Sequence, residues 1–245
     1  MPPTDASTDT GTSPTPHIGG GADDTLDLRL PEELIALFGE GTPTSVGVPS
    51  DAASAGGLLD APAGWGPVTT SVGVFRLVPV RIERDLARIT RWMNDPAVAA
   101  FWELSGPEAV TAAHLRPQLE GDGRSIPCLG VLDGIPMSYW EIYRADLDPL
   151  ARHYPSCPHD TGIHLLVAGV ADRGRGVGTT LLRAVSGLVL DHRPRCGRVI
   201  AEPDLRNTPS VSAFLSAGFR FQAEVDLPDK RAALMVRDRA LRDLL

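Results

Sequence analysis

One run between His164 and Gly178 constrains the fold of this chain more than any other feature. The apolar stretch His164-Leu-Leu-Val-Ala-Gly-Val170 breaks into the basic turn Ala-Asp-Arg-Gly-Arg-Gly-Val-Gly178, and an amphipathic segment follows. This pattern predicts a buried strand, a tight glycine turn and a helix. Glycine allows close backbone approach, and a helix N-terminus carries a positive partial charge, so the turn is a candidate site for a phosphate-bearing cofactor.

Two common phosphate-binding motifs do not fit this turn. No Lys-Ser or Lys-Thr follows the glycines, and Gly174-x-Gly176-x-Gly178 lacks the dinucleotide spacing Gly-x-Gly-x-x-Gly. The remaining pattern, Arg173-x-x-Gly176-x-Gly178, resembles the pyrophosphate loop of the GCN5-related N-acetyltransferases (GNATs), which binds coenzyme A. The alternative is a tight connection that binds nothing.

Composition narrows the class of protein. With 245 residues, 42% of them hydrophobic and 22% charged, the chain suits one catalytic domain plus a tail. The net charge of −8 argues against a nucleic-acid partner. There is no apolar run of membrane-spanning length and no basic residue before Arg29, so we expect a cytoplasmic protein without membrane contact. Cys128, Cys157 and Cys196 have neither metal-site nor disulfide spacing, which predicts reduced thiols and no metal.

The chain divides into three parts by composition. Residues 1–24 are rich in Pro, Thr, Ser, Gly and Asp and should form a disordered tail. Residues 25–74 are expected to be a loose N-terminal extension, with a short strand and helix between Leu28 and Phe38. Regular periodicity begins at Phe75, so the catalytic domain is predicted to span residues 75–245.

Alternating strand and helix patterns in the third part predict an α/β fold with a mixed sheet. Asp133-Gly134 indicates a type I′ hairpin between two antiparallel strands. Thr208-Pro209 marks a helix start. The predicted strands are 75–80, 128–132, 137–143, 164–170, 198–202, 219–225 and 232–236, and the predicted helices are 85–93, 177–189 and 208–217.

Four segments carry a narrower resemblance. They are Trp92-Met-Asn-Asp-Pro96 with Trp102, Ser138-Tyr-Trp-Glu-Ile-Tyr143, Pro158-His-Asp160 with Gly162 and His164, and Ala201-Glu-Pro-Asp-Leu-Arg-Asn207. Between Phe75 and Arg239 the chain resembles the siderophore-biosynthesis branch of the GNAT family. That branch includes the aerobactin hydroxylysine acetyltransferase, the mycobactin lysine N-acyltransferase and the desferrioxamine-type hydroxycadaverine acyltransferases. The resemblance implies the GNAT fold, a mixed, mostly antiparallel central sheet flanked by helices.

The resemblance also implies a reaction. An acyl group would pass directly from acyl-CoA (acetyl-CoA or succinyl-CoA), or from an acyl carrier protein, to a small-molecule hydroxylamine or amine, giving a hydroxamate or an amide. No acyl-enzyme forms in this chemistry. Attack on a thioester requires a free nitrogen lone pair, a base that takes a proton and donors for the developing oxyanion.

His164 and Asp204 are the predicted catalytic residues, and both match the His and Asp of the family's site. His164 begins the strand beside the glycine turn, and an imidazole titrates near working pH, so we expect a general base; the alternative is a structural hydrogen bond at a strand start. Asp204 follows the next strand, where neighbouring strand ends could bring the two side chains together. It would orient His164 or bind a substrate cation, and the alternative is an Asx turn.

The remaining predicted site residues form a cofactor set and an acceptor set. Asn207 would contact the pantetheine arm or cap a helix, and the arginines of the turn would reach phosphates or remain solvated. The cofactor set is Val167, Arg173, Gly174, Arg175, Gly176, Gly178, Thr179 and Asn207. Aromatic side chains would wall an aliphatic acceptor slot, with core packing as the alternative, and polar ones would meet its ammonium group. The acceptor set is Trp92, Trp102, Tyr139, Trp140, Glu141, His159 and Asp160.

Two other functions are compatible with the sequence. An aminoglycoside 6′-N-acetyltransferase would have an acidic, open cleft and would release CoA only with the antibiotic. A non-catalytic CoA-sensing module would tolerate His164→Ala and Asp204→Ala but would still require the glycine turn.

Overall fold

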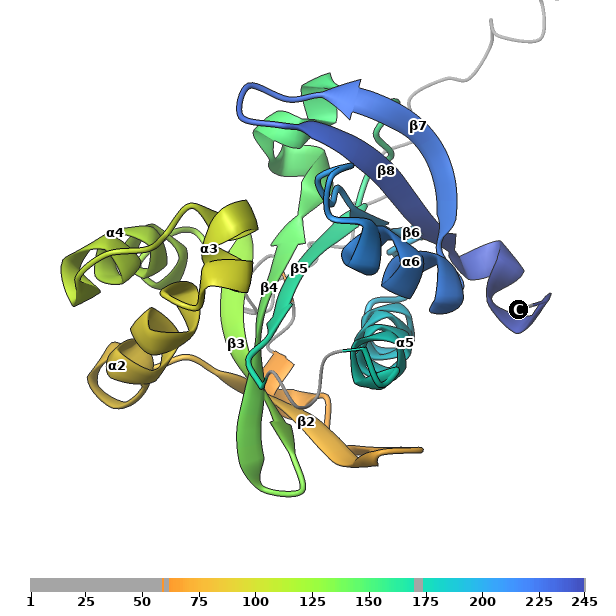
Figure 1. The fold of residues 1–245 in the computed structure, drawn as a ribbon. Helices are drawn as coiled ribbons and strands as arrows, with labels where there is room; N and C mark the ends of the chain where they lie inside the picture. Colours follow the sequence, from red (N-terminus) through yellow and green to blue (C-terminus); the bar gives the residue numbers. More distant parts are fainter. Residues whose placement is uncertain (1–58, 60–61, 170–173, 245) are drawn as a thin grey trace, which may run out of the picture. The chain divides into compact units, whose positions relative to one another are not determined.

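An eight-stranded sheet forms the centre of the computed structural model, which describes residues 59, 62–169 and 174–244 (Figure 1). The tail expected over residues 1–24 and the elements expected between Leu28 and Phe38 lie outside the described residues. The strands are β1 (Val68–Thr70), β2 (Gly73–Pro79), β3 (Ser125–Leu132), β4 (Ile135–Arg144), β5 (Thr161–Val167), β6 (Arg198–Ala201), β7 (Arg220–Asp226) and β8 (Arg231–Asp238). The α-helices are α2 (Ile82–Met93), α3 (Pro96–Trp102), α4 (Glu108–Leu119), α5 (Val177–His192) and α6 (Thr208–Ser216), and short 3-10 helices cover Pro62–Gly64, Ala145–Leu147, Pro149–Arg152 and Arg239–Leu244.

The sheet is mixed and mostly antiparallel, as predicted. Its strand order is β1-β2-β3-β4-β5-β6-β8-β7, and β5 with β6 is the parallel pair. At the β3–β4 hairpin, Asp133 and Gly134 have φ angles of 46° and 83°, as a type I′ turn requires. The short dipeptide signal therefore predicted this connection correctly.

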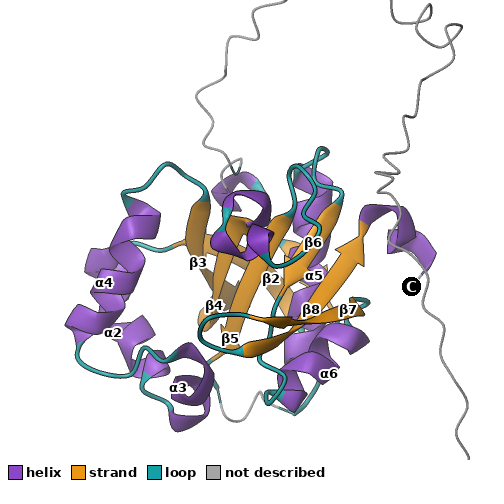
Figure 2. Ribbon diagram, turned by 90° about the horizontal axis from the view of Figure 1, so that it is seen from above, coloured by secondary structure: helices purple, strands orange, loops and turns teal. Residues whose placement is uncertain are grey.

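Helices cover both faces of the sheet (Figures 1 and 2). On one face, α2 buries Ile89 and Met93 in a cluster that also holds Tyr139 of β4. On the other face, residues of α5 pack in a second cluster with Trp140 of β4. Tyr139 and Trp140 lie on opposite faces because successive side chains of a strand alternate.

The sheet also includes residues that the sequence analysis placed in the N-terminal extension. β1 pairs antiparallel with β2, and both Leu59 and Trp65 are buried in the cluster beside α5. Residues before Phe75 thus contribute to the core of the domain. None of the helices in the described part of the chain has the length and apolar character that a membrane crossing requires.

β5 and β6 pair over only part of their length. β5 pairs with β4 at seven positions, but with β6 only through Thr161 and Gly162. Gly162 is required here because a Cβ atom at this position would lie 2.0 Å from the ring of Tyr143. His164, two residues further along β5, lies where the two strands separate.

Candidate functional site

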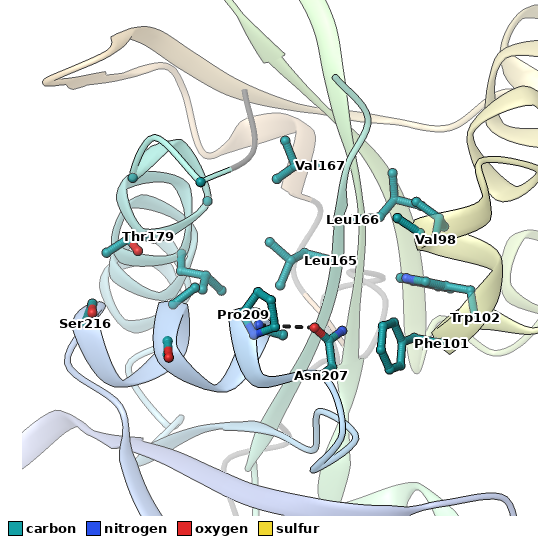
Figure 3. Close-up of a pocket in the computed structure, with 18 residues that line it drawn as sticks. Val98, Phe101, Trp102, Leu165, Leu166, Val167, Thr179, Asn207, Pro209 and Ser216 are labelled. Carbon is teal, nitrogen blue, oxygen red and sulfur yellow. Dashed lines mark hydrogen bonds between the residues drawn. The ribbon is translucent and has the colours of Figure 1, made fainter. Parts of the chain in front are cut away.

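A cavity of about 770 Å³ lies beside the free part of β5, between the start of α5, helix α6 and the far side formed by α3 (Figure 3). In Figure 3, Phe101 and Trp102 of α3 lie across from Pro209 of α6, with Asn207 between Pro209 and Phe101. Six predicted cofactor residues line this cavity: Val167, Gly174, Gly176, Gly178, Thr179 and Asn207. Arg175 is exposed and is not among the lining residues, and Arg173 lies outside the described residues.

The glycine turn leaves open space over its backbone. Gly174 and Gly176 have φ angles of 71° and 79°, and no atom lies within 4 Å of a Cβ built on either residue. Gly176 is the N-cap of α5, which is 16 residues long. A β-carbon at Gly178 would meet only Val167, at 3.8 Å. Backbone N–H groups and the helix dipole can therefore face an anionic group in this cavity, which fits the phosphates of acyl-CoA.

Asn207 has both a structural contact and a position in the cavity. Its Oδ1 accepts a hydrogen bond from the backbone N–H of Ser210 at 3.2 Å, which makes it the N-cap of α6 (Figure 3). The capping role is therefore present in the structure. Contact with the pantetheine arm stays a prediction.

His164 is held between two carboxylates. Its Nδ1 lies 2.9 Å from Oε2 of Glu141, its partner across the β4–β5 ladder, and its Nε2 hydrogen-bonds to Oε1 of Glu202. Glu202 follows the last residue of β6, so this second contact bridges the separation between β5 and β6. The ring of Tyr143 lies 4.8 Å from the imidazole and that of Trp102 lies 6.1 Å away.

Glu141 is buried and fully engaged. Its Oε1 accepts hydrogen bonds from the Tyr139 hydroxyl and from Gln118 Nε2, each at 2.8 Å, and also contacts His114 Nε2. The Ser125 hydroxyl donates to Gln118 Oε1 at 2.7 Å and so fixes the amide. Burial raises the pKa of Glu141, but the adjacent histidines outweigh it and hold that pKa far below its usual range. This carboxylate is occupied by the protein, which corrects the prediction that it meets a substrate ammonium.

Glu202 has a similar environment on the other side of His164. Its Oε2 accepts a hydrogen bond from the Tyr143 hydroxyl at 2.9 Å, and Lys230 Nζ lies 3.6 Å from its Oε1. Burial raises the pKa of Glu202, but His164, Lys230 and Tyr143 together lower it to about 2. Across the described residues, no group of three or more His, Cys, Asp and Glu side chains is arranged to hold a metal ion.

The two carboxylates change the expected state of His164. Burial lowers the pKa of this imidazole, but Glu202 and Glu141 outweigh it and raise the pKa to about 10. The sequence analysis expected a group that titrates near working pH, and the structure corrects this. His164 is an imidazolium at neutral pH in the free protein, and it must lose a proton before it can act as a base.

Asp204 does not orient His164, which corrects one of its two predicted roles. Its Oδ2 lies 2.6 Å from Arg206 Nη2, and its Oδ1 accepts from the backbone N–H of Arg206 at 2.7 Å. By Asp204 the chain has left β6, since this residue forms an isolated bridge with Ala232. Glu202, closer to the end of the strand, takes the place beside His164. A contact of Asp204 with a substrate cation stays a prediction.

The four predicted acceptor aromatics separate into two groups. Trp102 lines the cavity, and its ring lies 5.6 Å from that of Tyr139 and close to His164. Trp140 is fully buried on the opposite face of the sheet, where its Nε1 donates to Ser138 Oγ, and Trp92 is a buried residue of α2. Core packing therefore explains Trp140 and Trp92. Tyr139 is fully buried as well and reaches the site only through its hydroxyl, which donates to Glu141, so Trp102 is the one of the four that lines the cavity.

His159 and Asp160 lie at the opposite end of β5 from the cavity and serve the fold. Asp160 is fully buried, forms an ion pair with Arg198 and accepts hydrogen bonds from the Tyr154 hydroxyl at 3.0 Å and from Cys157 N–H at 2.9 Å. His159 has a φ of 68° and donates its backbone N–H to an Asp146 oxygen. These contacts correct the prediction that the pair meets the acceptor.

The sequence analysis missed His114, Gln118, Glu202 and Lys230. His114 and Gln118 lie on α4, which was not predicted because its apolar residues form no clear stripe, Pro117 interrupts it and no side chain caps its start. Glu202 was within a quoted segment but was passed over for Asp204. Its position at the end of β6, directly after a buried strand, was the signal that could have found it.

Comparison with known proteins identifies the family of this chain. Residues 81–227 match the family model of the acetyltransferase (GNAT) domain. A lysine N-acyltransferase of Mycolicibacterium paratuberculosis is 38% identical over 154 residues, which cover 63% of this chain and 69% of that protein. An N(6)-hydroxylysine O-acetyltransferase of Escherichia coli is 40% identical over 63% of this chain, and the match covers only 49% of that protein. An N-hydroxyputrescine acetyltransferase of Acinetobacter baumannii is 30% identical over 65% of this chain, and the match covers 76% of that protein. These names confirm the resemblance stated from the sequence motifs.

Solved structures share the architecture. An uncharacterized protein from Bacillus halodurans has a TM-score of 0.68 and 31% identity, covering 73% of this chain and 92% of that chain. An aminoglycoside acetyltransferase, AAC(6′)-Ib, solved with acetyl-CoA and an aminoglycoside, has a TM-score of 0.62 and 26% identity over 69% of this chain and 94% of its own. The chain therefore belongs to the GNAT acetyltransferase family and is an acyl-CoA-dependent N-acyltransferase.

Proposed function

We propose that this enzyme transfers an acyl group, acetyl or succinyl, from acyl-CoA to an N-hydroxylated diamine or to N6-hydroxylysine, forming a hydroxamate for siderophore biosynthesis. The observation that carries the proposal is the position of His164. Its imidazole, held by Glu141 and Glu202, lies where β5 and β6 separate, one residue from the cavity-lining Leu165. The relatives named for lysine, hydroxylysine and hydroxyputrescine support this class of acceptor.

The cavity supports acyl-CoA as the donor. Gly174 and Gly176 would hold its phosphates with backbone N–H groups, and Asn207 would lie beside its pantetheine arm. Bound acyl-CoA supplies the thioester carbonyl carbon that the acceptor nitrogen attacks. The apolar side chains of Val98, Phe101 and Leu166 on the cavity wall would limit the access of water to that bond.

The polar side of the site suits an acceptor nitrogen that gives up a proton. A hydroxylamine is less basic than an alkylamine and is largely neutral at pH 7, so its lone pair is free when it binds. His164, after loss of its own proton, receives the proton of the attacking nitrogen. Trp102 would pack against the aliphatic chain. Asp204, at the exit of β6, would meet its distal ammonium group only by giving up contacts with Arg206.

Aminoglycoside acetylation is the second candidate, because the fold matches AAC(6′)-Ib at 26% identity. An aminoglycoside is a bulky polycation that requires a wide acidic cleft. In this chain two of the buried carboxylates at the site, Glu141 and Glu202, are already engaged by protein donors. The structure therefore favours a slender acceptor with few positive charges.

A grid of donors and acceptors tests the proposal. CoA release is followed with a thiol reagent for acetyl-CoA and succinyl-CoA against hydroxycadaverine, cadaverine, N6-hydroxylysine, lysine and kanamycin, and hydroxamate is detected by its ferric complex. We expect release and a ferric colour with a hydroxylated acceptor. Release only with kanamycin would move the enzyme to the aminoglycoside class, and release only with unhydroxylated amines would reject hydroxamate formation.

A variant of the glycine turn tests the donor site in the same assay. Gly176→Val places a branched side chain at a positive φ, which costs about 1–3 kcal/mol, and blocks the open space above the backbone. We expect weaker CoA binding by calorimetry and a raised KM for acyl-CoA. Unchanged CoA affinity in this variant would reject the glycine turn as the phosphate site.

A further inference from the structure

His114 is the second imidazole of the site, and the acyl-transfer chemistry described above does not use it. It projects from α4, and its Nε2 contacts the same Glu141 carboxyl group whose other oxygen binds His164. The two histidines therefore share one buried carboxylate. His114 keeps 30% of its side chain exposed, whereas Glu141 keeps only 6%.

The engaged nitrogens of His164 restrict how its proton can leave. Nδ1 faces Glu141 and Nε2 faces Glu202, so a proton that departs from either nitrogen passes first to a carboxylate. Beyond Glu202 lie the buried Tyr143 hydroxyl and the Lys230 ammonium. Neither is a good proton acceptor, because an ammonium is already fully protonated and a phenol is a donor at this carboxylate.

The groups on the far side of Glu141 differ in whether they can accept a proton from it. Tyr139 and Gln118 donate to its Oε1 and cannot carry a proton onward at neutral pH, but an imidazole can accept a proton on one ring nitrogen and release one from the other. We propose that His114 is the outer member of a proton relay through which Glu141 passes the proton of His164 to solvent. The proposal rests on the proposed function of His164 as the base.

Each step of the relay moves one proton along an existing hydrogen bond. The Nδ1 proton of the His164 imidazolium passes to Glu141 Oε2, leaving a neutral imidazole and a neutral carboxylic acid. A half turn of the carboxyl group exchanges its two oxygens, so Tyr139 and Gln118 keep an acceptor. The proton then passes to His114 Nε2, and His114 loses a proton to water. No electrons move, and His164 is left neutral, with its free lone pair on Nδ1 and its remaining proton on Nε2.

Gln118 offers a matched control for this role. It lies one turn after His114 on α4, and its Nε2 contacts both the same Glu141 Oε1 atom and His114 Nε2, at 3.1 Å, but its amide carries no exchangeable acid–base proton. If His114 only positioned Glu141, Gln118→Leu and His114→Gln would have comparable effects. If it relays protons, only His114→Gln would interrupt transfer, because the glutamine amide replaces the contact without the titrating ring.

Proton exchange at His164 measures the relay without any acceptor. With histidine nitrogens labelled by ¹⁵N, NMR gives the rate at which water exchanges with the His164 Nδ1 proton. We expect at least about a tenfold slower exchange in His114→Gln, with the wild-type rate in Gln118→Leu. Equal rates in all three proteins, or equal slowing in both variants, would overturn the relay. Because the measurement needs no turnover, it remains decisive if the proposed reaction fails.

The pH dependence of CoA release gives a second readout. In His114→Gln we expect kcat to fall more than kcat/KM, because proton release follows acceptor binding, and we expect the loss to shrink as added imidazole supplies a mobile proton carrier. Gln118→Leu should lose some activity uniformly with pH and should not respond to imidazole. Failure of imidazole to restore any activity to His114→Gln would contradict the relay.

Discussion

Strand β5 has buried charged groups at two places, beside its first residue and around His164 further along, and they are held in different ways. At the first place Asp160 is paired with the guanidinium of Arg198, which remains charged at every accessible pH. Three residues into the strand, His164 is paired with two carboxylates and is the titrating member of its cluster. The same strand thus carries a permanent ion pair and a proton-exchanging one.

The difference shows which buried charges serve the fold and which serve chemistry. A carboxylate satisfied by arginine, a tyrosine hydroxyl and a backbone N–H is held by partners that keep their charge, as Asp160 is. A carboxylate paired with an imidazole has a partner that can change its charge state, as His164 can between Glu141 and Glu202. Burial alone does not distinguish the two cases, so the identity of the partner decides.

The largest expected effect comes from His164→Ala. Loss of a general base lowers turnover by roughly 10²- to 10⁴-fold, and CoA binding should change little because the cavity is left intact. Turnover is measured by CoA release and binding by calorimetry on the same protein. Wild-type turnover in this variant would show that the cluster around His164 serves the fold, as the Asp160–Arg198 pair does.

Arg198→Met is the corresponding change at the other place. It leaves the buried Asp160 carboxylate without its cation, which costs about 3–5 kcal/mol of folding free energy. Denaturant unfolding measures this loss, while kcat per folded enzyme should stay at the wild-type value. A large fall in kcat with unchanged stability would contradict a structural role for this pair.

Glu202→Gln tests how Glu202 controls His164, through the pH dependence of stability and of kcat. The folded-state pKa of His164 is raised from 6.5 to about 10, so the stability gained from its charge is complete below pH 6.5 and is lost as the pH rises through 10. Removing the Glu202 charge lowers that pKa, by about one unit or more. The alkaline loss of thermal stability and the rise of kcat with pH should both move to lower pH. Profiles that coincide with wild type would show that Glu202 does not control His164.

A matched pair of tyrosines gives the smallest effects. Tyr143 donates its hydroxyl to Glu202, and Tyr154 donates its hydroxyl to Asp160. Each change to Phe removes one hydrogen bond to a charged group, which should lower the free energy of unfolding by about 1.5–3 kcal/mol. Denaturant unfolding measures this loss. Only Tyr143→Phe should also shift the pH profile of kcat. A shift in Tyr154→Phe of the same size would mean that the two places are coupled.

Much of the fold was predictable, because local signals agree with it. The Asp133-Gly134 turn, the glycine turn before α5 and the Asn207 cap of α6 each follow from a few neighbouring residues. Helix α4 was not predicted, since its periodicity is weak and its stability comes from packing against α2 and β3. With α4 unpredicted, the contribution of His114 to the site could not be foreseen.

The sequence by itself determined the family, the cavity-lining glycine turn and the place of His164 on the strand before that turn, because each is encoded in a short contiguous pattern. Only the tertiary structure decided that Glu202 rather than Asp204 meets His164, and that Trp140 and Asp160 belong to the core. Those outcomes depend on which way a side chain points after a strand ends and on which face of the sheet it occupies. The charge state of His164 was decided in the same way, because it is set by two carboxylates from different strands.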